Sequence, residues 1–247
     1  MVHYFGQPQD IIRFKNFSKE NCLWLIEDNA HGHGGTFNGE LLGTFGDFGI
    51  SSPRKILGSL RSGGLLFWNR PDVPISKIPR MPEFPVSKSR RTLSRFLRKI
   101  PKLAIARNFL GKTMKSRPCY ENPNAFRELM IDDYAMDPFS LDQFNTANWS
   151  TIRKLRQKAY RYWAVFTHRR GLEPVFKVLH PEANPWCCPV YVKNQREAIY
   201  WFNWGWQNNY QVFSWPNLPE ETIDQNGVAL RRWKKLVCFS TDSFPNI

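Results

Sequence analysis

The chain has 247 residues, of which 42% are hydrophobic and 15% aromatic, and its formal net charge at neutral pH is +14. This aromatic content excludes a disordered protein, and the length suffices for a buried core in one or two domains. No uncharged stretch approaches the ~20 apolar residues of a membrane span, and no signal peptide opens the chain. The five cysteines lack CxxC spacing, so we expect reduced thiols in a cytoplasmic protein.

The chain opens with the pattern of a βαβ unit. Apolar residues predict a strand over residues 2–5, a helix over 11–21 and a second strand over 23–26. An acidic pair, Glu27 and Asp28, follows the second strand directly. Open α/β sheets bind ligands beyond the carboxyl ends of their strands, so this pair is a candidate for a functional site.

A glycine-rich loop leads to a second apolar stretch over residues 45–50, followed by the hydroxyls of Ser51 and Ser52 and then by Lys55. These residue types suit pyridoxal phosphate. The aldehyde of this cofactor needs a lysine amine, and its pyridine nitrogen needs an acidic partner such as Asp28. Its phosphate is bound by hydroxyls and by N–H groups at the start of a helix.

Four ordered elements carry a family resemblance. They are the box Glu27-Asp28-Asn29-Ala30-His31, the glycine box from Gly39 to Asp47, the serines that precede Lys55, and the pair Gly63-Gly64 before the next strand. This order resembles the DegT/StrS family of PLP-dependent sugar aminotransferases, within the fold-type-I aspartate aminotransferase superfamily.

The resemblance implies a role for each site residue. Asp28 would pair with the pyridine nitrogen, His31 would lie near the ring, and Lys55 would form the Schiff base and then move the proton during transamination. Ser52, three residues before Lys55, has the usual spacing of a phosphate-binding serine, and Ser51 is the alternative. The resemblance also implies an amino donor, a nucleotide-linked keto sugar as substrate, and a homodimer.

Structural roles compete with these functional ones. An aspartate at the end of a strand commonly caps a helix, and a single lysine is commonly a surface residue. His31 and His33 form an H-x-H pair, but no cysteine or carboxylate cluster completes a coordination set, so we predict no metal site. The order of the four elements, rather than any one residue, favours the cofactor site.

Compared with the family, the resemblance begins late. The first strands of the large domain, the turn that cradles the cofactor phosphate and the aromatic residue that stacks on the ring have no counterpart before Met1. We therefore expect a truncated form of the fold, in which the absence of these parts weakens PLP binding and reduces or abolishes activity. The alternative function is that of a non-catalytic remnant that binds a partner protein.

Residues 88–117 contain eleven lysines and arginines and no acidic residue. Leu93, Phe96, Leu97 and Ile100 recur at helical spacing within them. Such a segment is typical of a solvated or substrate-facing helix, of a surface that contacts anionic membranes weakly, or of a nucleic-acid patch. Because no zinc finger, RNP box or GxxG loop accompanies it, we predict no specific nucleic-acid binding. A basic peripheral membrane protein stays as a further alternative.

The carboxyl-terminal part alternates short helices and strands. Asn122-Pro123 and Asp137-Pro138 predict turns, residues 151–166, 194–204 and 220–235 predict helices, and residues 174–179, 188–192 and 212–215 predict strands.

The predicted fold class is α/β, a truncated fold-type-I PLP-dependent transferase. A partial mixed-sheet large domain is followed by a small α+β carboxyl-terminal domain. We assign residues 1–70 to the carboxyl-terminal part of the PLP-binding large domain and residues 71–150 to a basic connecting region. Residues 151–247 would hold the interdomain helix and the small domain.

Overall fold

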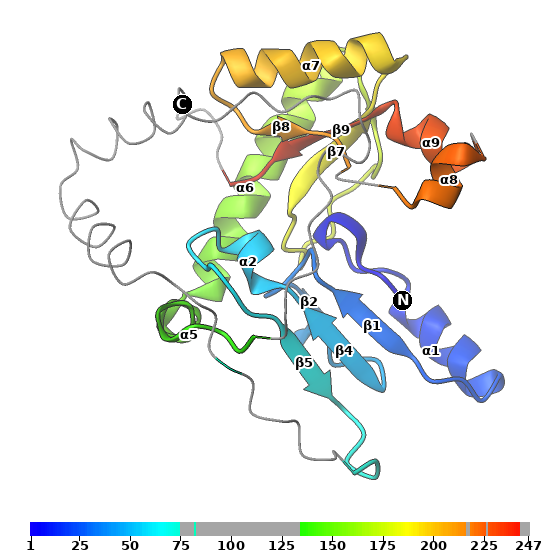
Figure 1. Cartoon of the computed structure of the whole chain (residues 1–247), viewed down its shortest axis with the longest axis vertical. Helices are drawn as coiled ribbons and strands as arrows, with labels where there is room; N and C mark the ends of the chain where they lie inside the picture. The colour runs from blue at the N-terminus through cyan, green and yellow to red at the C-terminus, as the bar shows by residue number, and fades with distance from the viewer. Residues whose placement is uncertain (75–81, 83–133, 216–217, 226, 243–247) are drawn as a thin grey trace.

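Two larger β-sheets and a separate two-stranded antiparallel sheet organise the described part of the chain. In this computed structural model the described part comprises residues 1–74, 82, 134–215, 218–225 and 227–242. The basic segment 88–117, with its predicted membrane contact, lies outside the described residues. In Figure 1 the first sheet lies at the bottom, the second lies at the top, and the long helix α6 (Trp149–His168) runs alongside both.

The first sheet has the order β1-β4-β5, with β1 and β4 parallel and β4 and β5 antiparallel. The elements of this part are η1 (Tyr4–Gly6), α1 (Ile11–Glu20), β1 (Ile26–Asn29), β2 (Thr36–Phe37), β3 (Glu40–Leu41), β4 (Phe48–Ser51), α2 (Pro53–Ile56) and β5 (Leu65–Trp68). The mixed sheet is the one predicted. Since β1 and β4 are parallel, their carboxyl ends meet at one edge, where both connections to the candidate site begin.

Two strands at the start of the chain differ from the prediction. The strand predicted over residues 2–5 is reduced to one bridge between Val2 and Asp28, because Phe5 and Gly6 turn the chain with φ values of 59° and 82°. Strand β1 begins at Ile26, three residues later than predicted at 23. The acidic pair Glu27 and Asp28 therefore lies inside the strand and not beyond its end.

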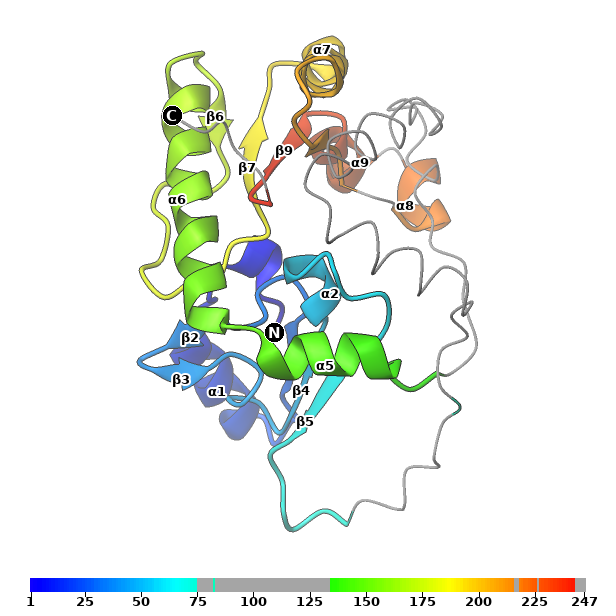
Figure 2. The same ribbon diagram turned by 90° about the vertical axis from the view of Figure 1, so that its left-hand side faces the viewer.

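The second sheet is antiparallel throughout, with the order β6-β7-β9-β8. The elements of this part are α5 (Pro138–Thr146), α6, β6 (Glu173–Pro174), β7 (Cys187–Tyr191), α7 (Gln195–Gln207), β8 (Val212–Phe213), α8 (Glu220–Asp224), α9 (Val228–Trp233) and β9 (Leu236–Ser240). Figure 2 shows α6 beside β6 and β7, with α7 at the upper end of this sheet.

Three predictions for this part were wrong in detail. Asp137 accepts hydrogen bonds from the backbone of Phe139 and Ser140, so Asp137-Pro138 begins helix α5 instead of a loop turn. The predicted strand 174–179 contracts to the two residues of β6. The predicted helix 220–235 is divided into α8 and α9 by the segment around Gly227.

The second sheet buries apolar side chains on both of its faces. Between this sheet, α6 and α7 lies an aromatic core that includes Trp163, Trp201 and Phe239. The opposite face carries Cys187 and Cys238, packed with Phe5. Cys187 and Cys188 thus point to opposite faces, as their adjacency in a strand requires. Phe5 is one of the links that join the start of the chain to this sheet.

Among the described helices, none combines the length and the apolar content that a membrane crossing requires.

Candidate cofactor site

The predicted site residues come from two connections at the carboxyl edge of the first sheet. Asp28 lies in β1 and His31 follows it, while Ser51 ends β4 and Lys55 lies in the short helix α2. The parallel register pairs Asp28 with Ile50 and Asn29 with Ser51. The pairing of β1 with β4 therefore brings residues 28–31 close to residues 51–55.

His31 is coupled electrostatically to both charged residues of the predicted site, Asp28 and Lys55. Its side chain is buried, and its Nδ1 accepts the backbone N–H of Phe5 at 3.3 Å, so the ring proton resides on Nε2. Burial and the positive charge of Lys55 lower the pKa of His31 to about 4, while the charge of Asp28 opposes this shift. His31 is thus neutral near pH 7 and lies within the electrostatic reach of both Asp28 and Lys55.

Asp28 is half-buried, and both its side chain and its backbone are hydrogen-bonded. Its Oδ1 accepts the N–H of Ala30 at 2.8 Å, which turns the chain toward His31. Its backbone bridges to Val2, with the N–H of His3 donating to the carbonyl of Asp28 at 2.9 Å. The carboxylate is therefore fixed at the sheet edge by local geometry.

Trp186, which sequence reasoning did not assign to the site, lies at its centre. The indole is 5.5 Å from Nζ of Lys55 and 4.7 Å from the His31 ring, at an interplanar angle of 32°. Trp215 lies on a second side of His31, at 5.3 Å and 69°. The only signal in the sequence was the high aromatic content, because nothing in the local spacing links residue 186 to residue 55.

Arg156 on α6 connects the two halves of the site. Its guanidinium donates to the carbonyls of Ile56, Pro185 and Trp186, to Oγ1 of Thr241 and to the carboxylate of Asp242. Burial lowers the pKa of Arg156 to about 10, with an opposing contribution from Cys187. One buried cation therefore holds the helix of Lys55 against the chain that carries Trp186.

The two candidate serines differ in their surroundings. Ser51 is buried, and its hydroxyl donates to the carbonyl of Asn29 at 3.2 Å, so Nδ1–H of His33 must donate to Ser51 Oγ at 2.9 Å. Burial lowers the pKa of His33 to about 4. Ser52 is half-buried at the N-cap of α2 and makes no side-chain capping bond.

Glu27, the first residue of the acidic pair, is fully buried and serves the fold. Its carboxylate accepts Nε2–H of His3 at 2.8 Å and the N–H groups of Gly43, Phe45 and Gly46 at 2.7, 2.7 and 3.1 Å. Burial alone would raise the pKa of Glu27, but these hydrogen bonds lower it below its usual value. Hydrogen bonds to the Glu27 carboxylate therefore join the acidic box to the glycine box.

Gly43 in that box and Gly49 in β4 allow close packing. A Cβ on Gly49 would lie 2.0 Å from the carbonyl oxygen of Gly43, and one on Gly43 would lie 2.7 Å from the Phe67 ring. Gly43 also has a φ of 108°, a backbone conformation that residues with a side chain rarely adopt. No group of three or more metal-ligand side chains occurs in the described part of the chain, and Nδ1 of both His31 and His33 is hydrogen-bonded to protein atoms.

Comparison with known proteins shows similarity to aminotransferases. Residues 1–92 match the DegT/DnrJ/EryC1/StrS aminotransferase family. A UDP-N-acetyl-3-dehydro-alpha-D-glucosamine 3-aminotransferase from Acidithiobacillus ferrooxidans is 37% identical over 67 residues, 26% of this chain and 18% of the relative. A dTDP-3-amino-3,4,6-trideoxy-alpha-D-glucose transaminase from Micromonospora megalomicea is 36% identical over 70 residues, 28% of this chain and 19% of the relative.

Solved structures extend the likeness beyond the matched sequence. Helicobacter pylori PseC, an aminotransferase of pseudoaminic acid biosynthesis, has a TM-score of 0.56 at 12% identity, covering 97% of this chain and 60% of its own. The GDP-4-keto-6-deoxy-D-mannose-3-dehydratase of E. coli, solved with hydrated PLP bound, gives 0.56 at 13% identity and covers 97% and 61%. These likenesses confirm the predicted fold class, and the chain spans about 60% of each solved protein. Residues 1–92 are thus similar in sequence to the DegT/DnrJ/EryC1/StrS aminotransferase family, and the chain has the fold of solved aminotransferases such as PseC.

Proposed function

We propose that this chain is an aminotransferase-like protein that binds PLP through Lys55. The observation that supports this most is the electrostatic coupling of the neutral His31 to both Asp28 and Lys55 at the carboxyl edge of the sheet. A lysine amine for the aldehyde and a carboxylate for the pyridine nitrogen are groups that PLP chemistry uses.

The residues present fit the cofactor. Bound PLP would supply an electron sink for the carbanion that forms during amino-group transfer. Asp28 would keep a proton on the pyridine nitrogen, and the amine of Lys55 would attach to the aldehyde and later move the proton between carbons. Ser52 offers its hydroxyl for the phosphate, because Ser51 already donates inside the core.

His31 would contribute to cofactor binding as a neutral hydrogen-bond donor. With Nδ1 accepting from Phe5, its Nε2–H is the one hydrogen-bond donor that the ring can present to the cofactor. Trp186 and Trp215 restrict the orientation of the imidazole from two sides. A neutral donor next to Lys55 also avoids a second positive charge, which would hinder the lysine from accepting a proton.

We further propose that the substrates are an amino donor and a nucleotide-linked keto sugar. Both curated relatives are named as enzymes that aminate such sugars, on UDP and dTDP carriers. The dehydratase in the structural comparison acts on a GDP-linked keto sugar with PLP bound. A homodimer and the division into domains at residues 70 and 150 remain part of this proposal.

Reductive trapping tests the proposal directly. The full chain would be incubated with PLP, treated with borohydride and digested, and the modified peptides would be mapped by mass spectrometry. We expect Lys55 to carry most of the label, and Lys55→Ala to remove it. Lys177→Ala is the matched control, because Lys177 is exposed and far along the chain from the site.

The role of Asp28 has its own test. In protein loaded with PLP, Asp28→Ala should lower the rate of the amino-donor half-reaction by about a hundredfold or more while Lys55 remains labelled, because the carboxylate stabilises charge that develops on the ring. Uniform labelling of exposed lysines, with Lys55 no more modified than Lys177, would contradict the proposal. That result would favour the non-catalytic partner-binding alternative.

A further inference from the structure

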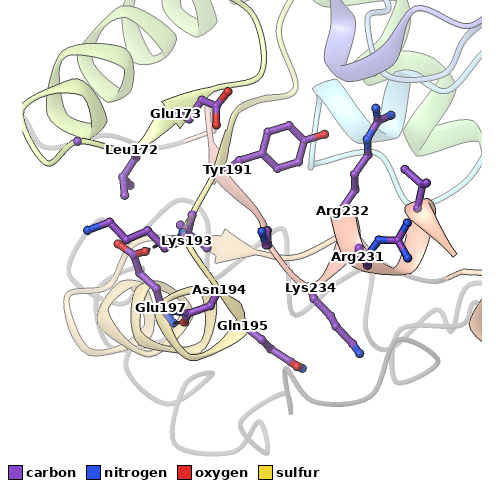
Figure 3. Close-up of a pocket in the computed structure, with 14 residues that line it drawn as sticks. Leu172, Glu173, Tyr191, Lys193, Asn194, Gln195, Glu197, Arg231, Arg232 and Lys234 are labelled. Atoms are coloured by element: carbon purple, nitrogen blue, oxygen red, sulfur yellow. Dashed lines mark hydrogen bonds between the residues drawn. The ribbon is translucent and has the colours of Figure 1, made fainter. Parts of the chain in front are cut away.

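A second hollow lies on the carboxyl-terminal sheet. It has a volume of about 650 Å³ and is lined by residues of three segments, 171–173, 191–197 and 228–235 (Figure 3). None of its lining residues comes from the segments that carry Asp28, His31 and Lys55, and Trp186 is not among them. The hollow is therefore a different place from the candidate cofactor site.

Positive charge dominates its walls. Five of the lining side chains are cationic and two are acidic: Lys193, Arg231, Arg232, Lys234 and Lys235 against Glu173 and Glu197. Glu197 is engaged locally, because its Oε2 accepts the backbone N–H of Lys193 at 2.9 Å and its own N–H donates to the N-cap Asn194. Its carboxylate therefore serves the start of α7 and leaves the hollow with an excess of positive charge.

The dipole of helix α9 explains the positions of only some of these cations. Arg231 and Arg232 lie in the last turn of α9, where cations interact favourably with the helix dipole. Lys193 lies on the opposite wall, at the end of β7, and Lys235 lies beyond the end of α9 at the start of β9. The backbone N–H of Val192 donates to the carbonyl of Lys235 at 2.9 Å, which brings these two walls together.

An aromatic hydroxyl faces the same space. Figure 3 shows the Tyr191 ring between Lys193 and Arg232, with its hydroxyl directed toward the Arg232 side. Tyr191 is half-buried, since part of its ring packs against the apolar cluster around Phe5 and Cys238. The ring is thus held in place, and its hydroxyl adds a donor next to the cations.

We propose that this hollow binds a small ligand with a diphosphate group, with Lys193 and Arg232 contacting it from opposite walls. The volume is within the range of about 300–1,000 Å³ that holds small molecules in proteins. Arginine and lysine are the usual partners of phosphate oxygens, and paired phosphates match cations from two walls better than a single charge does. The ligand is either a free diphosphate or the diphosphate of a nucleotide.

Calorimetric titration of the full chain with inorganic pyrophosphate, at about 0.15 M salt to screen diffuse surface attraction, tests the site. We expect one binding event per chain. Lys193→Glu and Arg232→Glu should each weaken it about tenfold or more, because each reverses a direct contact. Lys177→Glu makes the same change in net charge at an exposed residue outside the hollow and should leave the affinity within about twofold.

A parallel titration with adenosine 5′-diphosphate identifies the source of the phosphates. If adenosine 5′-diphosphate binds more tightly than pyrophosphate, the ligand is a nucleotide. If it does not, the ligand is the free diphosphate. Both results support the site. Absence of pyrophosphate binding would overturn the proposal. Equal weakening by Lys177→Glu and by the two hollow variants would also overturn it, because it would mean that net charge alone attracts the anion. Circular dichroism of each variant confirms that the chain is folded.

Discussion

The indole of Trp186 lies 5.5 Å from Nζ of Lys55, with the imidazole of His31 against the same indole at 4.7 Å. The lysine lies in helix α2, which follows β4 of the first sheet, and the tryptophan directly precedes β7 of the second sheet. The candidate site therefore depends on how the two sheets pack against each other. A cation above an indole face contributes about 0.5–2 kcal/mol, so this contact also helps to join the two parts.

Replacement of Glu27 should destabilise the fold strongly. Glu27→Ala leaves the donors on His3, Gly43, Phe45 and Gly46 without their acceptor in a buried position, and we expect a loss of about 3–5 kcal/mol in the free energy of unfolding. Urea denaturation measures this loss. Glu40→Ala, at an exposed carboxylate on β3, is the control and should change stability by less than about 0.5 kcal/mol. A small effect at Glu27 would contradict its role as the anchor of the glycine box.

Stability should fall as the pH is lowered from about 6.5 toward 4. Burial lowers the pKa of both His31 and His33 to about 4 from 6.5, so the unfolded state binds more protons in this window. The free energy of unfolding then rises with pH up to the unfolded pKa and is flat above it. Each shift corresponds to about 3 kcal/mol at most. Urea denaturation across this pH range measures the effect.

A double variant isolates the histidines. Replacing His31 and His33 by glutamine should flatten the dependence between pH 4 and 6.5, whereas His168→Gln, at an exposed position, should leave it unchanged. The lowered pKa of Glu27 adds stability that is present above the usual carboxyl pKa and is lost only as the pH falls through the lower, folded value. An unchanged profile in the double variant would exclude the two histidines as its cause.

Loss of the Arg156 guanidinium should separate Trp186 from Lys55. Arg156→Leu leaves the carbonyls of Ile56 and Trp186 and the carboxylate of Asp242 without this donor, and we expect about 3 kcal/mol or more of destabilisation. Arg161→Leu, at an exposed position of the same helix, is the control. Arg156→Lys restores the charge with fewer donors and should recover only part of the stability.

A second readout distinguishes positioning from stability alone. If Arg156 positions the site, the rate of PLP labelling at Lys55 should fall in Arg156→Lys under conditions where that variant is still folded. An unchanged labelling rate would mean that Arg156 contributes only to stability.

The basic segment should bind anionic vesicles by charge. Residues 88–117 carry eleven positive charges, each worth up to ~1 kcal/mol near an anionic surface, with an attraction that fades over about 8 Å at physiological salt. Co-sedimentation should therefore be lost at high salt and should not occur with neutral vesicles. Binding that survives high salt and is abolished by Phe96→Asp would instead support a peripheral membrane protein.

The cofactor hypothesis could be reached from the sequence because its residues lie close together in the chain. Asp28, His31, Ser52 and Lys55 belong to two successive connections of one sheet, so the spacing of boxes in residues 27–55 already fixes their neighbourhood. The helix of residues 11–20 and the long helix α6 were predictable from the local pattern, whereas the mixed sheet was expected from the family resemblance. Hydrophobic period and local caps are properties of neighbouring residues.

The strand boundaries were harder to predict from the sequence. The acidic pair lies within β1 because pairing with β4 begins at Ile26, and that register depends on a partner 22 residues further along the chain. The start of the chain turns after Val2, where Phe5 packs against Phe176 and Trp215, two residues beyond the ends of β6 and β8. Neither contact leaves a mark in the local pattern.

The sequence by itself determined the family boxes, the charge and the chemistry that Asp28 and Lys55 offer. Only the tertiary structure decided that Glu27 is a structural anchor, that Ser51 is hydrogen-bonded inside the core, and that Trp186 and Arg156 lie beside the candidate site. The physical reason is burial. Whether a polar side chain serves the fold or remains available to a ligand depends on which donors and acceptors surround it, and those come from distant parts of the chain.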